Sequence, residues 1–475
     1  MKRLGLAMLG MGLMSVAVQA ADVTIKWKTE QQEIEGFGGS GAYLQAQNLM
    51  KLPESDRTAV LDLLFSTTKG AGLSIIRNSI GDGGLTAEGK TWGNDTDGPS
   101  PTIEPKEGQW NWTGDEGQIW FMKEAKKRGC TRFISAAWSP PAWMKSNNSV
   151  INGGNLKKDK YRVYAEYLAE YVNGYKKHHG LDIYAVSPQN EPTFSGGYSC
   201  CQWTPGDFLE FTKNHIIPVW KEKSVPAKYM LGEHMAWTED FAVPSLNDSQ
   251  ACARVDIVAA HGYGWPQGFG VLPVSTAKGK KIWETEVYNN GDDSNNREGK
   301  GTIENGLYWA EYIHNHMTVS RLNAWLYWWL IAKYNFEGCL ITVGPEATKL
   351  NSAGGNKIVK SYIVYPRLWV VGNFSRFVRP GWFRIEATAK PAEGVLVTAY
   401  KDKKTGAFAV VAINKTDADQ ALSLAIDGAK AAAATPYRTS AKENLQQLDE
   451  VKFAGGKLPV TLAPKSVTTF VGKAK

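Results

Sequence analysis

Eight short runs rich in β-branched and aromatic residues recur along the chain, and each ends in polar, Gly or Pro residues before a pattern of helical spacing begins. Strands that alternate with helices in this way predict a parallel sheet, because a crossover must return the chain to the starting edge. Eight such units predict closure into a (β/α)₈, or TIM, barrel of the α/β class. An open, doubly wound sheet is the alternative that the pattern alone leaves. The predicted strands are 33–38, 73–80, 131–137, 181–187, 228–233, 255–261, 280–286 and 323–329.

Beyond residue 382 the pattern changes to short alternating strands separated by Lys, Gly and Asp turns. This pattern predicts a β-sandwich domain beside the barrel. The alternating segment 23–28 is expected to pair with the last strand, 466–471, which makes the smaller domain discontinuous. We therefore expect a leader over 1–20, a catalytic barrel over 30–381, and a side β-domain built from 21–29 and 382–475.

The first twenty residues have the parts of a secretory signal. Lys2 and Arg3 precede an apolar run from Leu4 to Val18, and the small residue Ala20 follows. No other apolar run approaches the roughly 18 residues that a membrane span needs. We expect cleavage near Ala20, export to the periplasm or the medium, and a mature protein without a membrane anchor.

Charge and cysteine content narrow the range of partners. The chain has 54 basic and 47 acidic residues, a net charge of +7, and no dense Lys/Arg block interleaved with aromatics. A nucleic-acid partner is therefore not expected. Five scattered cysteines are too few for a disulfide scaffold, although an exported protein can form one bridge. The odd count leaves at least one thiol unpaired.

No motif predicts a metal or a cofactor. The chain has no H-E-x-x-H, no metal-spaced Cys/His cluster and no G-x-S-x-G. Residues 36–41 match G-x-G-x-x-G by letters, but no helix follows promptly, and Asp56 does not follow a second strand. We expect neither metal nor cofactor.

Two predicted strands end in glutamates. Glu191 follows the strand 181–187, and Glu286 ends the strand 280–286. In a (β/α)₈ barrel the carboxyl ends of the strands carry the active site, so these side chains should face each other. Retaining hydrolysis of a glycosidic bond needs two carboxyl groups about 5–5.5 Å apart. We predict Glu191 as the general acid/base and Glu286 as the nucleophile; on spacing alone Glu284 could replace Glu286, which lies nearer the strand end.

Other side chains near strand ends are suited to bind a sugar. Aromatic faces stack on the C–H faces of sugar rings, and the chain has 18 Trp. Asn190 can hydrogen-bond a hydroxyl beside the scissile bond, and Tyr263 could orient the nucleophile. His261 is as well suited to a structural hydrogen bond as to catalysis. The candidate substrate-binding residues are Trp138, Trp143, Asn190, His261, Tyr263 and Trp329.

Seven motifs are together specific: 36–39, 75–77, 138–145 with 153–157, 189–192, 283–286 and 374–381. From about residue 30 to the carboxyl terminus, the chain resembles glycoside hydrolase family 30, which includes glucosylceramidase, endo-β-1,6-glucanases and bacterial xylanases. The resemblance implies a barrel with a side β-domain and a retaining mechanism, with Glu191 as acid/base and Glu286, not Glu284, as nucleophile. It also implies sugar contacts in the cleavage subsite for Trp138, Asn190 and Trp329. Arg77, which lies in one of the motifs, joins the candidate binding residues.

Within that family, the later segments look most similar to bacterial xylanases. Relatives that require a glucuronic acid branch bind its carboxylate with an Arg four residues past a Trp pair, a Tyr and a Ser. Here Tyr288 is kept, but Lys333 occupies the Arg position and Gly291 the Ser position. Lys is a point charge that cannot form a bidentate fork. The resemblance therefore does not imply strict dependence on the branch.

Our main expectation is a secreted, monomeric, retaining endo-β-glycanase that hydrolyses plant cell-wall xylan, with the polysaccharide as its partner. A β-1,6-glucanase or a glucosylceramidase-like β-glucosidase of the same family is the alternative among enzymes. The alternative from another class is a carbohydrate-binding protein whose barrel has lost its chemistry.

Overall fold

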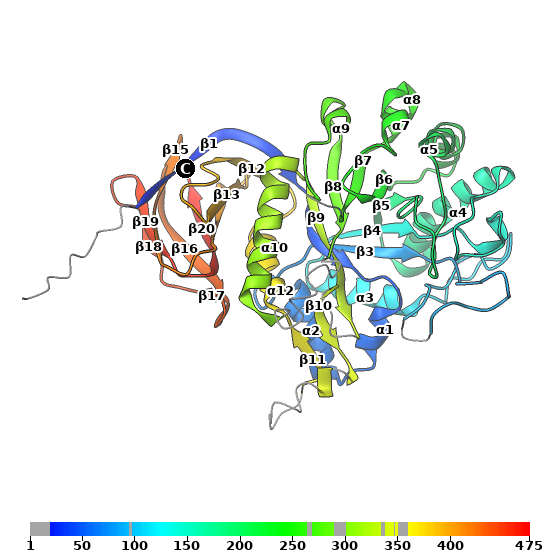
Figure 1. Ribbon diagram of the computed structural model, residues 1–475, viewed down its shortest axis with the longest axis horizontal. Coiled ribbons are helices and arrows are strands. Elements are labelled where there is room, and N and C mark those ends of the chain that lie inside the picture. Colours follow the sequence, from blue (N-terminus) through cyan, green and yellow to red (C-terminus); the bar gives the residue numbers. More distant parts are fainter. Residues whose placement is uncertain are drawn as a thin grey trace, which may run out of the picture.

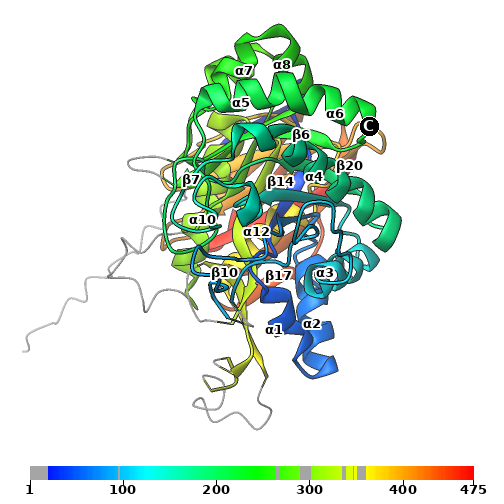
Figure 2. The same ribbon diagram turned by 90° about the vertical axis from the view of Figure 1, so that its right-hand side faces the viewer.

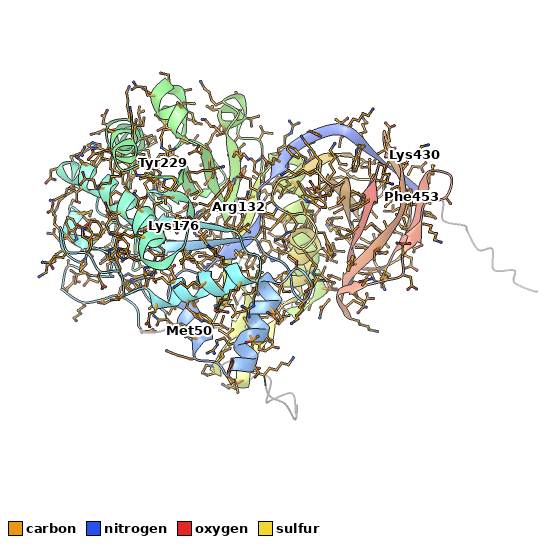
Figure 3. The ribbon with its side chains drawn as sticks, turned by 180° about the vertical axis from the view of Figure 1, so that it is seen from behind. Met50, Arg132, Lys176, Tyr229, Lys430 and Phe453 are labelled. Atoms are coloured by element: carbon orange, nitrogen blue, oxygen red, sulfur yellow. The ribbon has the colours of Figure 1, made fainter. Side chains whose placement is uncertain are left out.

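The computed structural model describes residues 20–94, 97–263, 268–288, 301–333, 338–345, 347–349 and 360–475. It consists of a barrel surrounded by helices and a sheet domain beside it (Figure 1). In the view from behind, Tyr229 and Lys176 belong to the barrel part, whereas Lys430 and Phe453 belong to the sheet domain (Figure 3). The predicted leader lies outside the described residues except for Ala20, and so does Gly291.

Eight parallel strands of the described chain close into a barrel. They follow one another in chain order from β2 to β9, and β9 pairs with both β8 and β2. This closure confirms the predicted barrel and excludes the open doubly wound sheet. The strands are β2 Gly36–Ser40, β3 Ile75–Ile80, β4 Arg132–Ala137, β5 Ile183–Ser187, β6 Lys228–Ala236, β7 Ile257–Tyr263, β8 Lys281–Glu286 and β9 Ala324–Ala332.

Apolar side chains fill the barrel, which is therefore a packed core and not a pore. A fully buried cluster inside it includes Ile134, Met230, Trp283 and Leu326. The glycine-rich start of β2 serves this packing: a Cβ on Gly38 would lie 2.1 Å from the carbonyl oxygen of Ile75. The letters that match a dinucleotide motif therefore reflect close strand contact.

A buried carboxylate closes the amino-terminal end of the barrel. Glu35, only 2% exposed, lies just before β2. It accepts hydrogen bonds from Tyr184 Oη at 2.7 Å and Trp283 Nε1 at 2.9 Å, and Lys281 Nζ lies 2.9 Å away. These partners come from the starts of β5 and β8, so a single side chain ties three strands together.

Helices surround the strands, as Figures 1 and 2 show from two sides. α10 and α12 lie between the barrel and the sheet domain. On α12, the Asn373 amide donates to the carbonyl oxygen of Tyr437 and to Thr469 Oγ1, which fastens the two parts to each other. The helices are α1 Gln45–Met50, α2 Glu54–Phe65, α3 Glu116–Lys127, α4 Tyr161–Gly174, α5 Pro205–Phe211, α6 Ile217–Glu222, α7 Val243–Asn247, α8 Ser249–Arg254, α9 Pro273–Ala277, α10 Ile303–Asn315 and α12 Pro366–Ser375.

The second sheet is almost entirely antiparallel and has its own apolar core, which includes Val397, Phe408, Leu424 and Phe470. Its strands are β1 Ala21–Ile34, β12 Trp382–Ala387, β13 Val395–Lys401, β14 Ala407–Asn414, β15 Gln420–Asp427, β16 Ala431–Ser440, β17 Glu443–Gln447, β18 Val451–Lys452, β19 Lys457–Leu462 and β20 Ser466–Ala474. Two short strands, β10 Cys339–Val343 and β11 Tyr362–Val364, instead extend the barrel sheet beyond β9.

The predicted partner of the amino-terminal strand was wrong. β1 joins the second sheet, but it pairs with β12 and, in parallel, with β15. The last strand, β20, lies between β14 and β16. β1 alternates buried Val23 and Ile25 with exposed residues, a pattern that any apolar sheet face satisfies, so it cannot select the neighbour.

Across the described residues, no helix is both long enough and apolar enough to cross a membrane. All five cysteines are free thiols, and Cys252 alone among them is not buried.

Replacing Glu35 with Gln should lower the melting temperature at neutral pH, by an amount equivalent to about 1–3 kcal/mol, because Lys281 and Lys228 lose a buried counter-charge. Burial raises the pKa of Glu35, but Lys281, Tyr184 and Lys228 outweigh burial and lower it overall. The carboxylate therefore stabilises the fold above its unfolded pKa, and this contribution is lost as pH falls through the folded pKa.

Thermal unfolding of the parent and Glu35→Gln, measured from pH 7 down to acid pH, should show two melting curves that converge in acid. Glu386→Gln is the control, since its pair with Lys26 is about half exposed and should contribute little. Equal melting temperatures of parent and Glu35→Gln at pH 7 would contradict a stabilising role.

Candidate active site

Glu191 lies just past the carboxyl end of β5, in a backbone conformation that is rare outside glycine. Its φ is 43°, in the left-handed region. Two backbone bonds hold this turn: Asn190 N–H donates to the carbonyl oxygen of Ala137 at 2.7 Å, and Glu191 N–H donates to that of Glu233 at 2.9 Å. The neighbouring strand ends β4 and β6 thus fix the direction of the Glu191 side chain.

Glu286 is the last residue of β8, and two donors hold its carboxylate. Arg77 Nη1 lies 2.7 Å from Oε2, and Tyr263 Oη donates to Oε1 at 3.0 Å. Burial raises the pKa of Glu286, and the charges of His261 and Arg77 only partly offset this effect. The carboxylate is therefore oriented yet poorly solvated.

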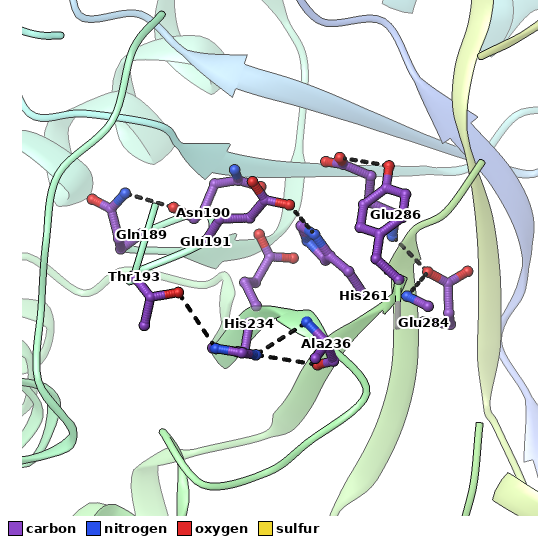
Figure 4. A network of polar contacts seen from close by, with 12 residues as sticks. Gln189, Asn190, Glu191, Thr193, His234, Ala236, His261, Glu284 and Glu286 are labelled. Atoms are coloured by element: carbon purple, nitrogen blue, oxygen red, sulfur yellow. Dashed lines mark hydrogen bonds and ion pairs between the residues drawn. The ribbon is translucent and has the colours of Figure 1, made fainter. Parts of the chain in front are cut away.

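The two glutamates face each other across a short gap (Figure 4). A carboxylate oxygen of Glu191, one of Glu286 and a ring nitrogen of His261 all lie within 4.8 Å of one another. Both carboxylates are largely buried, with Glu191 7% and Glu286 5% exposed. The spacing fits the close pair of a retaining glycosidase and is shorter than the range of about 6.5–9.5 Å for inverting enzymes.

Arg77, at the centre of the site, is fully buried on β3. Its Nη2 donates to Asn190 Oδ1 at 2.5 Å and lies 2.7 Å from Glu233 Oε2, in addition to the bond to Glu286. Its guanidinium carbon lies 4.5 Å from the centre of the Trp138 ring. Burial lowers the pKa of Arg77, but Glu233 and Glu286 raise it overall, so the guanidinium stays charged.

His261 connects β7 to the pair. Its Nδ1 lies 3.0 Å from Glu191 Oε1, and the two atoms share one proton in a hydrogen bond. Burial lowers the pKa of His261, but the charges of Glu286 and Glu191 raise it overall. The imidazole is therefore coupled electrostatically to both glutamates.

Glu284 does not take part in this gap. It is fully buried, and its Oε1 accepts the N–H groups of Glu286 at 2.9 Å and Gly262 at 3.3 Å. The carboxyl of Glu284 is directed at the backbone and not across the gap, which favours Glu286 over Glu284 as the residue that acts with Glu191.

Aromatic rings form a wall beside the pair. The Tyr43 ring lies 5.2 Å from Trp138 and 6.2 Å from Trp328. Trp329 stacks on Trp328 at 4.9 Å, and Tyr288 meets Tyr263 edge-on at 5.5 Å. The predicted residues Trp138, Tyr288 and Trp329 therefore lie around the acidic centre.

Two other predicted binding residues, Trp143 and Lys333, contact neighbouring loops. The Trp143 indole donates to the carbonyl oxygen of Glu104 at 3.2 Å, and Lys160 Nζ lies 5.6 Å from its ring centre. These contacts fix the position of the Trp143 indole, and its contact with a sugar stays a prediction. Lys333 follows β9, and its Nζ lies 3.5 Å from Asn94 Oδ1 on the loop after β3.

Sequence reasoning missed Glu233, Tyr43 and Tyr198. Glu233 lies near the end of β6 and could have been found by the same strand-end rule that selected Glu191 and Glu286. Tyr43 follows β2 and packs 6.4 Å from Tyr198, which lies in the loop between β5 and α5. The sequence carries no signal for these two loop residues, because only the fold of the loops places them near Glu191 and Glu286.

One group of side chains in the described part of the chain could reach a single cation: Glu191, His261 and Glu286. The Arg77 guanidinium already contacts the Glu286 carboxylate, and its charge would repel a metal ion at that position.

The sequence and the fold match known glycoside hydrolases. The model of O-glycosyl hydrolase family 30 matches residues 20–258 and 272–342. Glucuronoxylanase XynC of Bacillus subtilis (strain 168) is 29% identical over 473 residues, which cover 98% of this chain and 94% of that protein.

Two solved xylanase structures superpose closely. The family 30 subfamily 8 xylanase Xyn30A from Clostridium acetobutylicum gives a TM-score of 0.76 at 28% identity, covering 95% of this chain and 99% of that one. The catalytic domain of family 30 xylanase C from Talaromyces cellulolyticus gives 0.78 at 26% identity, covering 95% and 100%. The chain therefore belongs to O-glycosyl hydrolase family 30 and is an O-glycoside hydrolase.

Proposed function

We propose that this protein is an exported, retaining endo-β-glycanase that cleaves the backbone of xylan. The observation that carries the mechanism is the close approach of Glu191 and Glu286, whose oxygens lie within 4.8 Å. That separation is below the range of about 6.5–9.5 Å that an inverting enzyme uses to place an attacking water beside the sugar, so one of the carboxyl groups attacks the sugar itself.

In the first step, Glu286 attacks the anomeric carbon while Glu191 gives a proton to the leaving glycosidic oxygen. Arg77 and Tyr263 hold the Glu286 carboxylate so that one oxygen is directed into the gap. The bond between the sugar and the leaving group breaks, and a covalent bond to Glu286 forms.

In the second step, Glu191 takes a proton from water, and the hydroxide attacks the anomeric carbon from the face opposite Glu286. Glu286 leaves as a carboxylate again, with Arg77 beside it to stabilise the returning charge. Two inversions give net retention of configuration. His261, which shares a hydrogen bond with Glu191, keeps that side chain aimed at the leaving oxygen.

Similarity to these relatives favours xylan as the substrate of this protein, since the two solved structures and XynC are all named as xylanases or as a glucuronoxylanase. The aromatic wall of Tyr43, Trp138 and Trp328 offers flat surfaces for sugar rings. A β-1,6-glucanase or a β-glucosidase activity would use the same two glutamates. A purely carbohydrate-binding role is disfavoured, because both acids and their orienting partners are in place.

The acidic branch of glucuronoxylan should help binding without being required. Lys333 brings one ammonium group, which cannot grip a carboxylate with two parallel bonds as Arg does. Its Nζ also lies 3.5 Å from Asn94 Oδ1. A single exposed charge pair contributes about 0–1 kcal/mol.

Replacing either glutamate with Gln should lower kcat on xylan by about 10³-fold or more, since Gln can neither attack nor transfer a proton. Reducing-sugar release measures this, with circular dichroism as a folding check. Glu239→Gln is the matched control: Glu239 is also buried but bonds the start of α9, away from the gap. Turnover that survives in Glu191→Gln or Glu286→Gln would refute the assignment.

The acid limb of kcat/KM against pH should have its midpoint above the ordinary value for Glu, because burial raises the pKa of Glu286, which must be ionised to attack. Tyr263→Phe should move this midpoint to still higher pH, since the Tyr263 hydroxyl stabilises the carboxylate. An acid limb in Tyr263→Phe that is unchanged or lies at lower pH would contradict this role.

Glucuronoxylan and linear xylan should both be cleaved, with kcat/KM values within about tenfold of each other, and β-1,6-glucan much more slowly. Mass spectrometry of the early products should show oligomers of mixed length, as an endo-enzyme produces. Lys333→Ala should reduce only the preference for the branched polymer. Faster cleavage of β-1,6-glucan, or of a small aryl glycoside, would favour the alternatives instead.

A further inference from the structure

The pairing of β7 with β8 contains a bulge directly below the acidic pair. Ala260 pairs with Glu284 and His261 pairs with Glu286, so Thr285 is an extra residue on β8 without a counterpart on β7. A bulge of this kind bends the strand and re-aims the side chains that follow it. Here the residue that follows on β8 is Glu286.

The Glu284 side chain closes this bulge. Its Oε1 accepts the N–H of Glu286 at 2.9 Å and the N–H of Gly262 at 3.3 Å. Both donors lie on the carboxyl-terminal side of the bulge, one on each strand. The carboxyl therefore satisfies two buried N–H groups at the place where the strands change register.

The end of β7 also carries two side-chain contacts to the acidic pair. Gly262 lies between His261, which contacts Glu191, and Tyr263, which contacts Glu286. Gly262 itself is tightly packed: a Cβ there would lie 2.5 Å from the Tyr312 hydroxyl. Any shift of β7 relative to β8 would therefore change both halves of the pair at once.

We infer that Glu284 is a positioning residue, whose carboxyl oxygen locks the β7–β8 bulge and thereby sets the Glu286 carboxylate at its attacking position. The inference rests on the proposed role of Glu286 as nucleophile. Glu284 acts through the backbone and contacts no substrate.

The charge of Glu284 is not needed for this task. The side chain is fully buried beside Glu286, and in the described part of the chain its Oε2 has no hydrogen-bond partner. The groups that face it are Glu286, Arg77 from β3 and Tyr312 from α10. Burial and the charge of Glu286 raise the pKa of Glu284 well above its usual value, although the two N–H groups and Arg77 oppose this. A neutral side chain of the same length should therefore serve equally well.

Two substitutions separate length from acidity. Glu284→Gln keeps an acceptor oxygen at the same distance from the backbone, so kcat on the polymer should stay within about twofold of the parent. Glu284→Asp keeps the acid but is shorter by one methylene, so kcat should fall about 10- to 100-fold with little change in KM. Glu239→Asp is the control, since Glu239 also accepts two backbone N–H bonds, from Val274 and Ser275, but at the start of α9.

Steady-state kinetics and melting temperatures of the three variants decide the question. Low kcat in Glu284→Asp alone, with both other variants near the parent in kcat, supports the inference. Loss of activity in Glu284→Gln, or a Glu284→Asp variant as active as the parent, overturns it. A Glu239→Asp variant that loses as much kcat also overturns it, because shortening any buried Glu would then suffice. Glu286→Gln, measured alongside, tests the proposed nucleophile independently of these outcomes.

Discussion

The buried guanidinium of Arg77 organises the active site. It contacts three oxygen acceptors near the carboxyl ends of three different strands: Asn190 after β5, Glu233 on β6 and Glu286 on β8. A charge this deep in a protein is tolerated only when its hydrogen bonds and counter-charges are supplied by the fold. The planar fork of Arg does this in fixed directions, so the positions of its partners are set by the position of β3.

Contacts at both ends of the barrel, and the core between them, hold the Arg77 site in place. Glu35 ties the amino ends of β5 and β8 together, and the buried cluster that includes Trp283 fills the barrel between the two ends. At the carboxyl ends, the bonds from Asn190 and Glu191 to the neighbouring strands fix the Glu191 side of the gap. The bulge at Thr285 sets the position of Glu286 on the other side. The short distance between the two carboxyl groups is thus maintained by the whole barrel.

The sequence was sufficient for the barrel and for the close approach of Glu191 and Glu286, because both follow from local patterns. The alternation of strand and helix periodicity repeats eight times. In this fold the carboxyl ends of all eight strands lie at the same face of the barrel, so residues at those ends come together there. The partner of β1 could not be predicted, since the alternation of Val23 and Ile25 fits any apolar sheet face. Tyr43 and Tyr198 were missed because loops bring them to the site. The task of Glu284 depends on a register shift that no spacing rule reveals.

The most direct test of the mechanism is to trap the covalent intermediate. A slow-reacting fluorinated xylo-oligosaccharide with a good leaving group should label the protein once, and peptide mass spectrometry should place the label on Glu286. The early products of xylan should then show retained anomeric configuration by NMR. Inverted products, or a label on a residue other than Glu286, would contradict a double displacement between Glu191 and Glu286.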